Sequence, residues 1–295
     1  MTNNIETHVN KNKDILIYIN GSLHKREDAK ISVYDSGFLM GDGIWEGLRL
    51  VDNEWIFIDE HLQRLIDGCK AIDIDIGMSV DEIKDALEQT RIINNMTSNA
   101  HARLMVTRGD KLKPFQQPAL SIDGPNIVII MEHSNPTPNK DGVIMVTVPQ
   151  IRGLPMSQDP KLNSHSKLNC ILACIQASKA GADEALMLDI HGFVNTTNSC
   201  NFFIVKNGEV WTSTGDYCMN GITRKNVIHL CKVNQIPVYE KNFSLVDVYS
   251  ADESFITGTL GSLTQVLSID NRNIGDKSSN WPITEKLRLL YKEIL

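Results

Sequence analysis

Short apolar segments joined by two-residue turns do most to restrict what this chain can fold into. Residues 15–19 end at Asn20-Gly21, and Asn207-Gly208 divides two later apolar segments. Asn-Gly is typical of tight β-hairpins, because the central residues of such turns need a positive φ. Separate helical segments lie between the strands. This mixture of hairpins and separate helices predicts an α+β fold and disfavours a doubly wound parallel sheet.

Two of the expected helices have clear signals. Ser79 and Glu82 form a capping-box pattern, and the apolar stripe at positions 168, 171, 172 and 175 follows helical spacing. Other helices are expected from about residue 60 and from about residue 223. The main expected strands cover residues 15–19, 31–33, 47–51, 55–58, 102–107, 126–132, 143–148 and 254–258, with a meander of three strands around the turns at 191–192 and 207–208.

The composition changes at residues 133–142, which contain two prolines, one glycine and no apolar residue. Such a segment is typical of a domain linker. We therefore expect a flexible tail at 1–13, an N-terminal α/β domain at 14–132, the linker at 133–142 and a C-terminal domain at 143–295.

The net charge of −7 over 295 residues argues against nucleic-acid and anionic-membrane partners, both of which need a basic surface. No signal-peptide core and no apolar stretch of roughly 20 residues is present. The six cysteines form no C-x-x-C pair, which indicates reduced thiols and a cytoplasmic location. Cys170 and Cys174 lie one helical turn apart but lack further ligands at metal spacing, so no metal site is expected.

A phosphate site is one interpretation of the segment Asn220-Gly221-Ile222-Thr223. The amides of Ile222 and Thr223 would be unpaired donors at the positive end of a helix dipole, and the Thr223 hydroxyl would add another. The alternative is an ordinary loop with Thr223 as N-cap. Thr257-Gly258-Thr259, at a strand end, has similar donors.

These motifs together resemble the class IV aminotransferases. The run YDSGFLMGDGIWEGLR at 34–49 is similar to the N-terminal signature of that family, and EHLQRL at 60–65, GITR at 221–224 and TGT at 257–259 follow in the family order. The resemblance implies a two-domain fold type IV enzyme, with a smaller N-terminal α/β sandwich and a larger C-terminal β-barrel-like domain with helices. It also implies pyridoxal 5'-phosphate as cofactor, bound by the C-terminal domain, and a homodimer.

Within this resemblance, the phosphate would be held by Arg64, the amides of Ile222 and Thr223, Gly258 and Thr259. The family lysine that forms a Schiff base aligns with Asn163, which lacks an amine. Two lysines are within reach. Lys167 lies where branched-chain members carry a tyrosine, and Lys161 lies two residues upstream. We favour Lys167, with Lys161 as the alternative catalytic residue.

A second departure is Thr196, which lies where the family has a glutamate facing the pyridine nitrogen. A hydroxyl stabilises a protonated ring nitrogen less than a carboxylate does. Arg108 resembles an arginine that binds the substrate carboxylate, and Arg103 is its rival. The expected activity is a branched-chain-like aminotransferase that moves an amino group between an amino acid and a 2-oxo acid. A lyase or racemase with the same cofactor, or a catalytically impaired binding protein, is the alternative.

Overall fold

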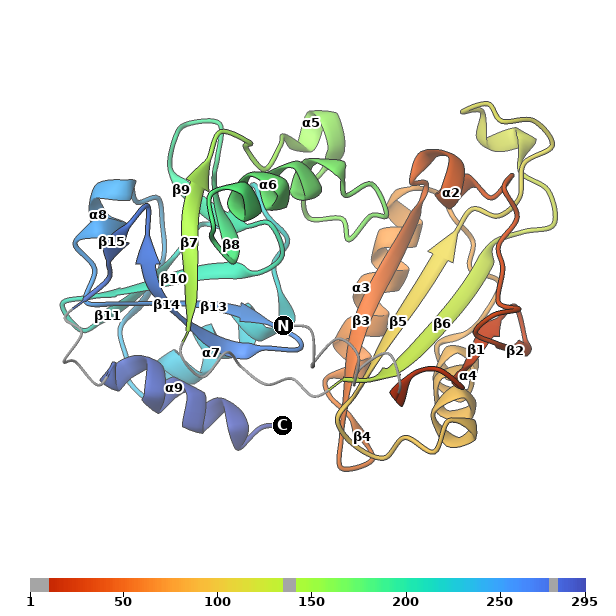
Figure 1. The fold of residues 1–295 in the computed structure, drawn as a ribbon, viewed down its shortest axis with the longest axis horizontal. Coiled ribbons are helices and arrows are strands. Elements are labelled where there is room, and N and C mark those ends of the chain that lie inside the picture. The colour runs from red at the N-terminus through yellow and green to blue at the C-terminus, as the bar shows by residue number, and fades with distance from the viewer. Residues whose placement is uncertain (1–10, 135–141, 276–280) are drawn as a thin grey trace. The chain divides into compact units, whose positions relative to one another are not determined.

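The computed structural model describes residues 11–134, 142–275 and 281–295 (Figure 1). The chain divides into two compact units. Unit 1 holds the described residues up to 134 together with Asn163–Ser166, and unit 2 holds the described residues of 142–162 and 167–295. Residues 1–10 of the expected tail and 135–141 of the expected linker lie outside the described residues, and His133 of that linker belongs to a strand.

Unit 1 contains an antiparallel sheet of six strands with the order β2-β1-β6-β5-β3-β4. The Asn20-Gly21 hairpin is confirmed, because Ile19 pairs with Ser22 across it. The strands are β1 (Leu16–Ile19), β2 (Ser22–Lys25), β3 (Gly43–Val51), β4 (Glu54–Trp55), β5 (Ala100–Thr107) and β6 (Asn126–His133).

Two long helices cover one face of this sheet. α3 (Ile58–Ala71) packs on β3, and α4 (Val80–Ile93) packs on β1 and β6. The capping box at the start of α4 is confirmed: Ser79 Oγ accepts the Glu82 amide at 3.2 Å, and Glu82 accepts the Ser79 amide at 2.7 Å. Alternating buried side chains of β3 and β5 form the core beneath the helices, as period-2 strands with one covered face require (Ile44, Leu48, Leu50, Ala102, Leu104, Val106).

A short segment distant in sequence completes unit 1. Asn163–Ser166 lies against the start of β3, where Ser164 forms an antiparallel bridge with Ile44. The Trp45 amide donates to the Asn163 carbonyl at 3.0 Å, and the His165 amide donates to the Gly43 carbonyl at 2.9 Å. The segment therefore extends the sheet at this edge of β3.

Unit 2 contains a closed ring of six strands, in the order β9-β10-β13-β14-β7-β8 and back to β9. The β-barrel-like second domain and the α+β class are thus confirmed. Both parallel and antiparallel pairs occur in the ring. The ring strands are β7 (Val143–Val148), β8 (Glu184–Leu188), β9 (Val194–Thr197), β10 (Asn201–Lys206), β13 (Glu253–Gly258) and β14 (Ser262–Ile269), and β11 (Glu209–Thr212), β12 (Val238–Glu240) and β15 (Arg272–Asn273) extend the sheet.

Helices surround the ring of unit 2. α7 (Ile222–Val233) contacts β13, α9 (Pro282–Lys292) contacts α7 and β14, and α8 (Leu245–Tyr249) follows β12. α6 (Leu168–Lys179) packs on β7 and β8 through its small residues Ala173 and Ala177. The predicted apolar stripe of α6 lies on the other side and is exposed. None of the helices in the described ranges is long and apolar enough to cross a bilayer.

Two expected strands were wrong. Residues 31–33 form none, because Ile31 and Val33 are exposed and have no strand partner within the described residues. The strand expected at 55–58 ends at Trp55. Phe57 takes a left-handed conformation with φ 53°, which redirects the chain into α3. The short helices α2 (Ser36–Met40) and α5 (Pro155–Gln158) were not predicted.

Candidate active site

Arg64 is fixed in unit 1 by a buried carboxylate that the sequence analysis did not single out. Glu46 of β3 is 0% exposed, and its two oxygens accept Nε and Nη2 of Arg64, each at 2.7 Å. His61, one turn earlier on α3, adds its Nδ1 to the same carboxylate at 2.7 Å. Burial acts to raise the pKa of Glu46, but the bonds from Arg64 and His61 outweigh it and hold the pKa below its ordinary value.

The remaining end of Arg64 is available for a ligand. Its Nη1 is buried and has no hydrogen-bond partner within the described part of the chain. A buried guanidinium nitrogen without an acceptor is costly, and natural structures pair such groups with protein, water or ligand atoms. The geometry therefore fits the anion-binding role that the sequence resemblance implied for Arg64.

The Asn201 side chain fixes the turn before α7 in unit 2. The Asn201 side chain accepts the Gly221 amide at 3.2 Å and donates to the Met219 carbonyl at 2.9 Å. A Cβ at position 221 would lie 2.4 Å from Asn201 Oδ1, so this approach requires glycine. Gly221 is the N-cap of α7 and no side chain caps the helix, which leaves its first amides, those of Ile222 and Thr223, as donors. The alternative prediction that Thr223 is the N-cap was wrong.

Donors from β13 lie beside this turn. Thr257 pairs with Asn201 across the antiparallel ladder, so the two side chains point to the same face. The Thr257 hydroxyl is buried and has no partner among the described residues. Gly258 ends β13 and Thr259 follows it, half-buried, in the turn to β14. Within unit 2, Thr257 therefore lies beside Asn201, whose side chain bonds the turn that leads into Ile222 and Thr223.

The Asn163 side chain makes a hydrogen bond to the backbone of β3. Its side-chain Nδ2 donates to the Trp45 carbonyl at 2.7 Å, and the residue is 5% exposed. Of the two candidate lysines, Lys167 directly precedes α6 and is half-buried, whereas Lys161 is exposed. The positive charge of Lys161 lowers the pKa of Cys218, although burial outweighs it and the pKa of that thiol is raised.

Thr196 has a backbone partner. Its hydroxyl donates to the Cys200 carbonyl at 2.7 Å, and the residue is 3% exposed on β9. With its proton engaged, the hydroxyl can only accept a further hydrogen bond. Thr196 can therefore receive an N–H from a ring nitrogen, without the negative charge that a glutamate would bring.

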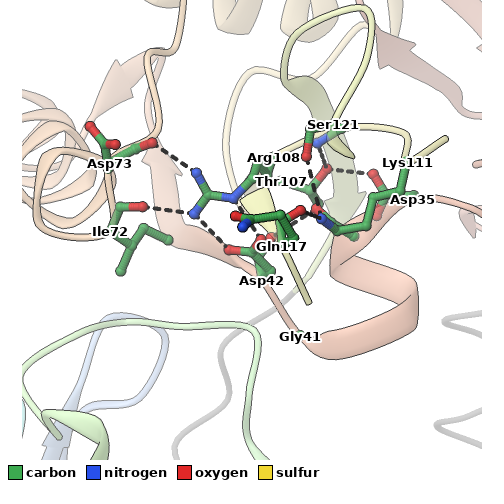
Figure 2. A network of polar contacts seen from close by, with 12 residues as sticks. Asp35, Gly41, Asp42, Ile72, Asp73, Thr107, Arg108, Lys111, Gln117 and Ser121 are labelled. Carbon is green, nitrogen blue, oxygen red and sulfur yellow. Dashed lines mark hydrogen bonds and ion pairs between the residues drawn. The ribbon is translucent and has the colours of Figure 1, made fainter. Parts of the chain in front are cut away.

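Arg108 and Arg103 have contrasting surroundings in unit 1. Figure 2 shows that the Arg108 guanidinium faces Asp42 and the carbonyls of Ile72 and Asp73, with distances of 2.7 to 3.1 Å. Arg103 instead places its guanidinium carbon over the Trp45 ring, 3.9 Å from the ring centroid. Burial lowers the pKa of Arg103 by more than the negative charge of Glu132 raises it, and the structure records no hydrogen bond for its guanidinium within the described residues.

Residues 43–269 match the family model for class IV aminotransferases. "Branched-chain-amino-acid aminotransferase-like protein 2" of Arabidopsis thaliana is 38% identical over 97% of this chain, which spans about half (51%) of the plant protein. A Methanocaldococcus jannaschii protein, provisionally assigned as a branched-chain-amino-acid aminotransferase, is 40% identical over 94% of this chain and 96% of its own length. The solved branched-chain amino acid aminotransferase from Thermoproteus uzoniensis, with norvaline, has a TM-score of 0.85 at 27% identity, with 95% and 94% of the two chains covered. The chain belongs to the class IV aminotransferase family.

Proposed function

We propose that this chain is a pyridoxal-phosphate-dependent aminotransferase that moves an amino group between a branched-chain-like amino acid and a 2-oxo acid. One observation carries the proposal: Arg64 Nη1 is a buried cationic donor without a partner in the described residues, on a side chain already fixed by Glu46. A phosphate is a ligand that such a buried guanidinium donor fits. Family membership supports the same cofactor.

Each unit, taken by itself, has candidate donors for a phosphate. In unit 1 the donor is Arg64 Nη1. In unit 2 the donors are the amides of Ile222 and Thr223 and the hydroxyls of Thr257 and Thr259. Gly221 and Asn201 hold the turn in a shape that a larger residue would block. The residues therefore fit a phosphorylated cofactor, although Asn163 does not fit the role of its lysine partner.

When bound, pyridoxal phosphate supplies the aldehyde that accepts the amino group and the ring that stabilises a carbanion. The chain must supply an amine that reacts with that aldehyde and moves a proton, and we assign this to Lys167, with Lys161 as the alternative. Lys167 is half-buried just before α6, whereas Lys161 is exposed, and this difference supports Lys167. Thr196 would accept the ring N–H.

For the substrate carboxylate we now favour Arg103 over Arg108. The Arg108 guanidinium already bonds Asp42 and two carbonyls, whereas Arg103 has its donors available beside Trp45. A guanidinium over an aromatic face is attracted through its charge, and its N–H groups can still donate two hydrogen bonds to a carboxylate.

The test is borohydride treatment of the purified protein loaded with pyridoxal phosphate, followed by peptide mapping. The wild type is expected to carry the reduced adduct on Lys167, and Lys167→Ala is expected to lose it while Lys161→Ala keeps it. The same samples are assayed with L-leucine, L-isoleucine and D-alanine as amino donors to 2-oxo acids. An adduct on Lys161 reverses the lysine assignment and retains the function.

Three other results would contradict the proposal. A protein that binds the cofactor but yields no adduct and no transfer is a binding protein of this family. A protein that remains colourless in excess pyridoxal phosphate has no cofactor site. Racemisation or elimination of the amino donor without transfer to a 2-oxo acid would replace aminotransferase by the racemase or lyase alternative.

We also propose a homodimer in the cytoplasm. The exposed stripe of α6 supports the dimer, because Leu168, Ile171, Leu172 and Ile175 are 42 to 68% exposed on one helix face. Six free cysteines support a reducing compartment. Light scattering should give the mass of two chains, and Ile171→Glu should give one. Leu289→Glu, at an exposed leucine of α9, is the control that should remain a dimer.

A further inference from the structure

The ion pair between Glu46 and Arg64 is not needed merely to attach α3 to β3. Glu46 lies on the helix-facing side of β3, between the buried residues Ile44 and Leu48. A carboxylate in such an apolar row is costly unless it is fully paired. An apolar residue would hold α3 against β3 without that cost.

The pairing uses one particular edge of the guanidinium. Glu46 Oε1 accepts Nε and Oε2 accepts Nη2, so the side edge of Arg64 is taken and the Nη1 end projects away from the carboxylate. The His61 Nδ1 contact with Oε2 restrains the carboxylate itself. Two bonds on one planar group fix both the position and the orientation of Nη1.

The unpaired atom distinguishes this arrangement from a structural ion pair. An ion pair that served only stability would leave no buried donor without an acceptor, since each such donor reduces stability. Nη1 is buried and has no acceptor within the described chain, while the side chain as a whole is 21% exposed. The side chain is held with its free end ready for an anion.

We propose that Glu46 is the positioning residue for the cofactor phosphate: it orients Arg64 so that Nη1 binds the phosphate, with His61 restraining Glu46. This inference rests on the proposed cofactor and deepens it. Glu46 does not touch the phosphate. Glu46 also carries a negative charge, which by itself would repel the phosphate. If Glu46 orients Arg64, its neutralisation should weaken phosphate binding, whereas charge repulsion alone predicts tighter binding.

The experiment measures binding of 4-deoxypyridoxine 5'-phosphate and of 4-deoxypyridoxine to the apo-protein by tryptophan fluorescence. Neither probe has an aldehyde, so neither depends on which lysine reacts. Glu46→Gln is expected to weaken binding of the phosphorylated probe about tenfold or more, because one carboxylate oxygen becomes an amide nitrogen that cannot accept from Arg64 or His61. Binding of the unphosphorylated probe is expected to change less than about twofold, since the phosphate contact is the only one affected.

Asp35→Asn is the matched control. Asp35 is another buried carboxylate of unit 1, bonded to Thr107, Asn126 and the Phe38 amide, with no recorded contact to Arg64. It is expected to leave both probe affinities unchanged. Glu46→Asp, which retains the charge on a side chain one methylene shorter, provides the measurement if Glu46→Gln does not fold, with an expected loss of about threefold to tenfold for the phosphorylated probe.

Several results would overturn the inference. Unchanged or tighter binding of the phosphorylated probe by Glu46→Gln would show that Glu46 acts only as a charge or as an anchor for α3. Equal weakening of both probes would indicate a general loss of structure. If the wild type binds neither probe, the proposed cofactor is wrong and so is the role of Glu46. If the wild type binds the phosphorylated probe and Glu46→Gln binds it equally well, only the role of Glu46 is wrong.

Discussion

Asn163 and Trp45 are joined by two hydrogen bonds: the Trp45 amide donates to the Asn163 carbonyl at 3.0 Å, and Asn163 Nδ2 donates to the Trp45 carbonyl at 2.7 Å. The side-chain amide thus continues the strand-like pairing that the backbone begins. At the position where the family resemblance places a reactive lysine, this chain has a residue that attaches the 163–166 segment to β3. A lysine amine could not be free to react while making the same contact.

Replacement of Asn163 by aspartate tests this attachment. In Asn163→Asp the donor becomes an oxygen that faces the Trp45 carbonyl, so the free energy of unfolding should fall by about 2 to 3 kcal/mol. Urea unfolding provides the measurement. Asn169→Asp is the control, because exposed Asn169 makes the same type of bond, to the Ile151 carbonyl at 2.8 Å, and should lose less than about 1 kcal/mol. Equal losses would contradict the assigned role of Asn163.

The two arginines of unit 1 should respond differently to substitution. Arg108→Ala leaves Asp42 and two carbonyls without their donor, and is expected to reduce the free energy of unfolding by about 2 to 4 kcal/mol. Arg103→Met retains an unbranched side chain of similar reach and should change stability by less than about 1 kcal/mol. Steady-state kinetics should show at least about a tenfold increase in KM for the amino donor in Arg103→Met. A normal KM in this variant would exclude Arg103 as the carboxylate ligand.

Asn201 should control the shape of the turn before α7, which we propose as a phosphate site. Asn201→Ala removes the acceptor for the Gly221 amide and the donor to the Met219 carbonyl. We expect binding of pyridoxal phosphate to weaken about tenfold, because the amides of α7 are no longer held in place. Asn234→Ala, at the other end of α7, removes a bond to the Leu230 carbonyl and should leave the affinity unchanged. Equal affinities in the two variants would show that the turn holds its shape without Asn201.

Stability should decrease in mild acid because of His101. Burial, with a smaller effect from the positive charge of Arg103, lowers the pKa of His101 from 6.5 to about 4. Between these values the unfolded chain binds a proton that the folded chain excludes, so the unfolding free energy falls as pH decreases from about 6.5 to 4, by up to about 3 kcal/mol. Above pH 6.5 this contribution is complete. The burial depends on Gly47, where a Cβ would lie 2.9 Å from His101 Nε2.

Urea unfolding at pH 7 and pH 4.5 provides the measurement. His101→Gln should show a smaller loss between the two pH values than the wild type. His229→Gln, at an exposed position of α7, should retain the wild-type loss. The prediction fails if His101→Gln and the wild type lose the same free energy.

Local patterns were sufficient for much of the fold. Asn20-Gly21 and the Ser79 to Glu82 capping box concern neighbouring residues, and both have the structure that their chemistry requires. The helix at 168–177 was also predicted, but its burial was not. Periodicity shows which residues share a face, whereas α6 packs through Ala173 and Ala177 and leaves its larger apolar residues exposed. Local sequence likewise misjudged residues 55–58, where one residue of positive φ ends the strand.

The sequence by itself determined the family and the segments that carry the donors, because EHLQRL, GITR and TGT are local and occur in the family order. It also determined that position 163 has no amine. Only the tertiary structure decided what those residues contact. Glu46 and Arg64 are 18 positions apart, and Trp45 and Asn163 are 118 apart. Such partners are brought together by packing of a helix on a sheet and by addition of a segment to a strand edge, and neither event has a local sequence signal.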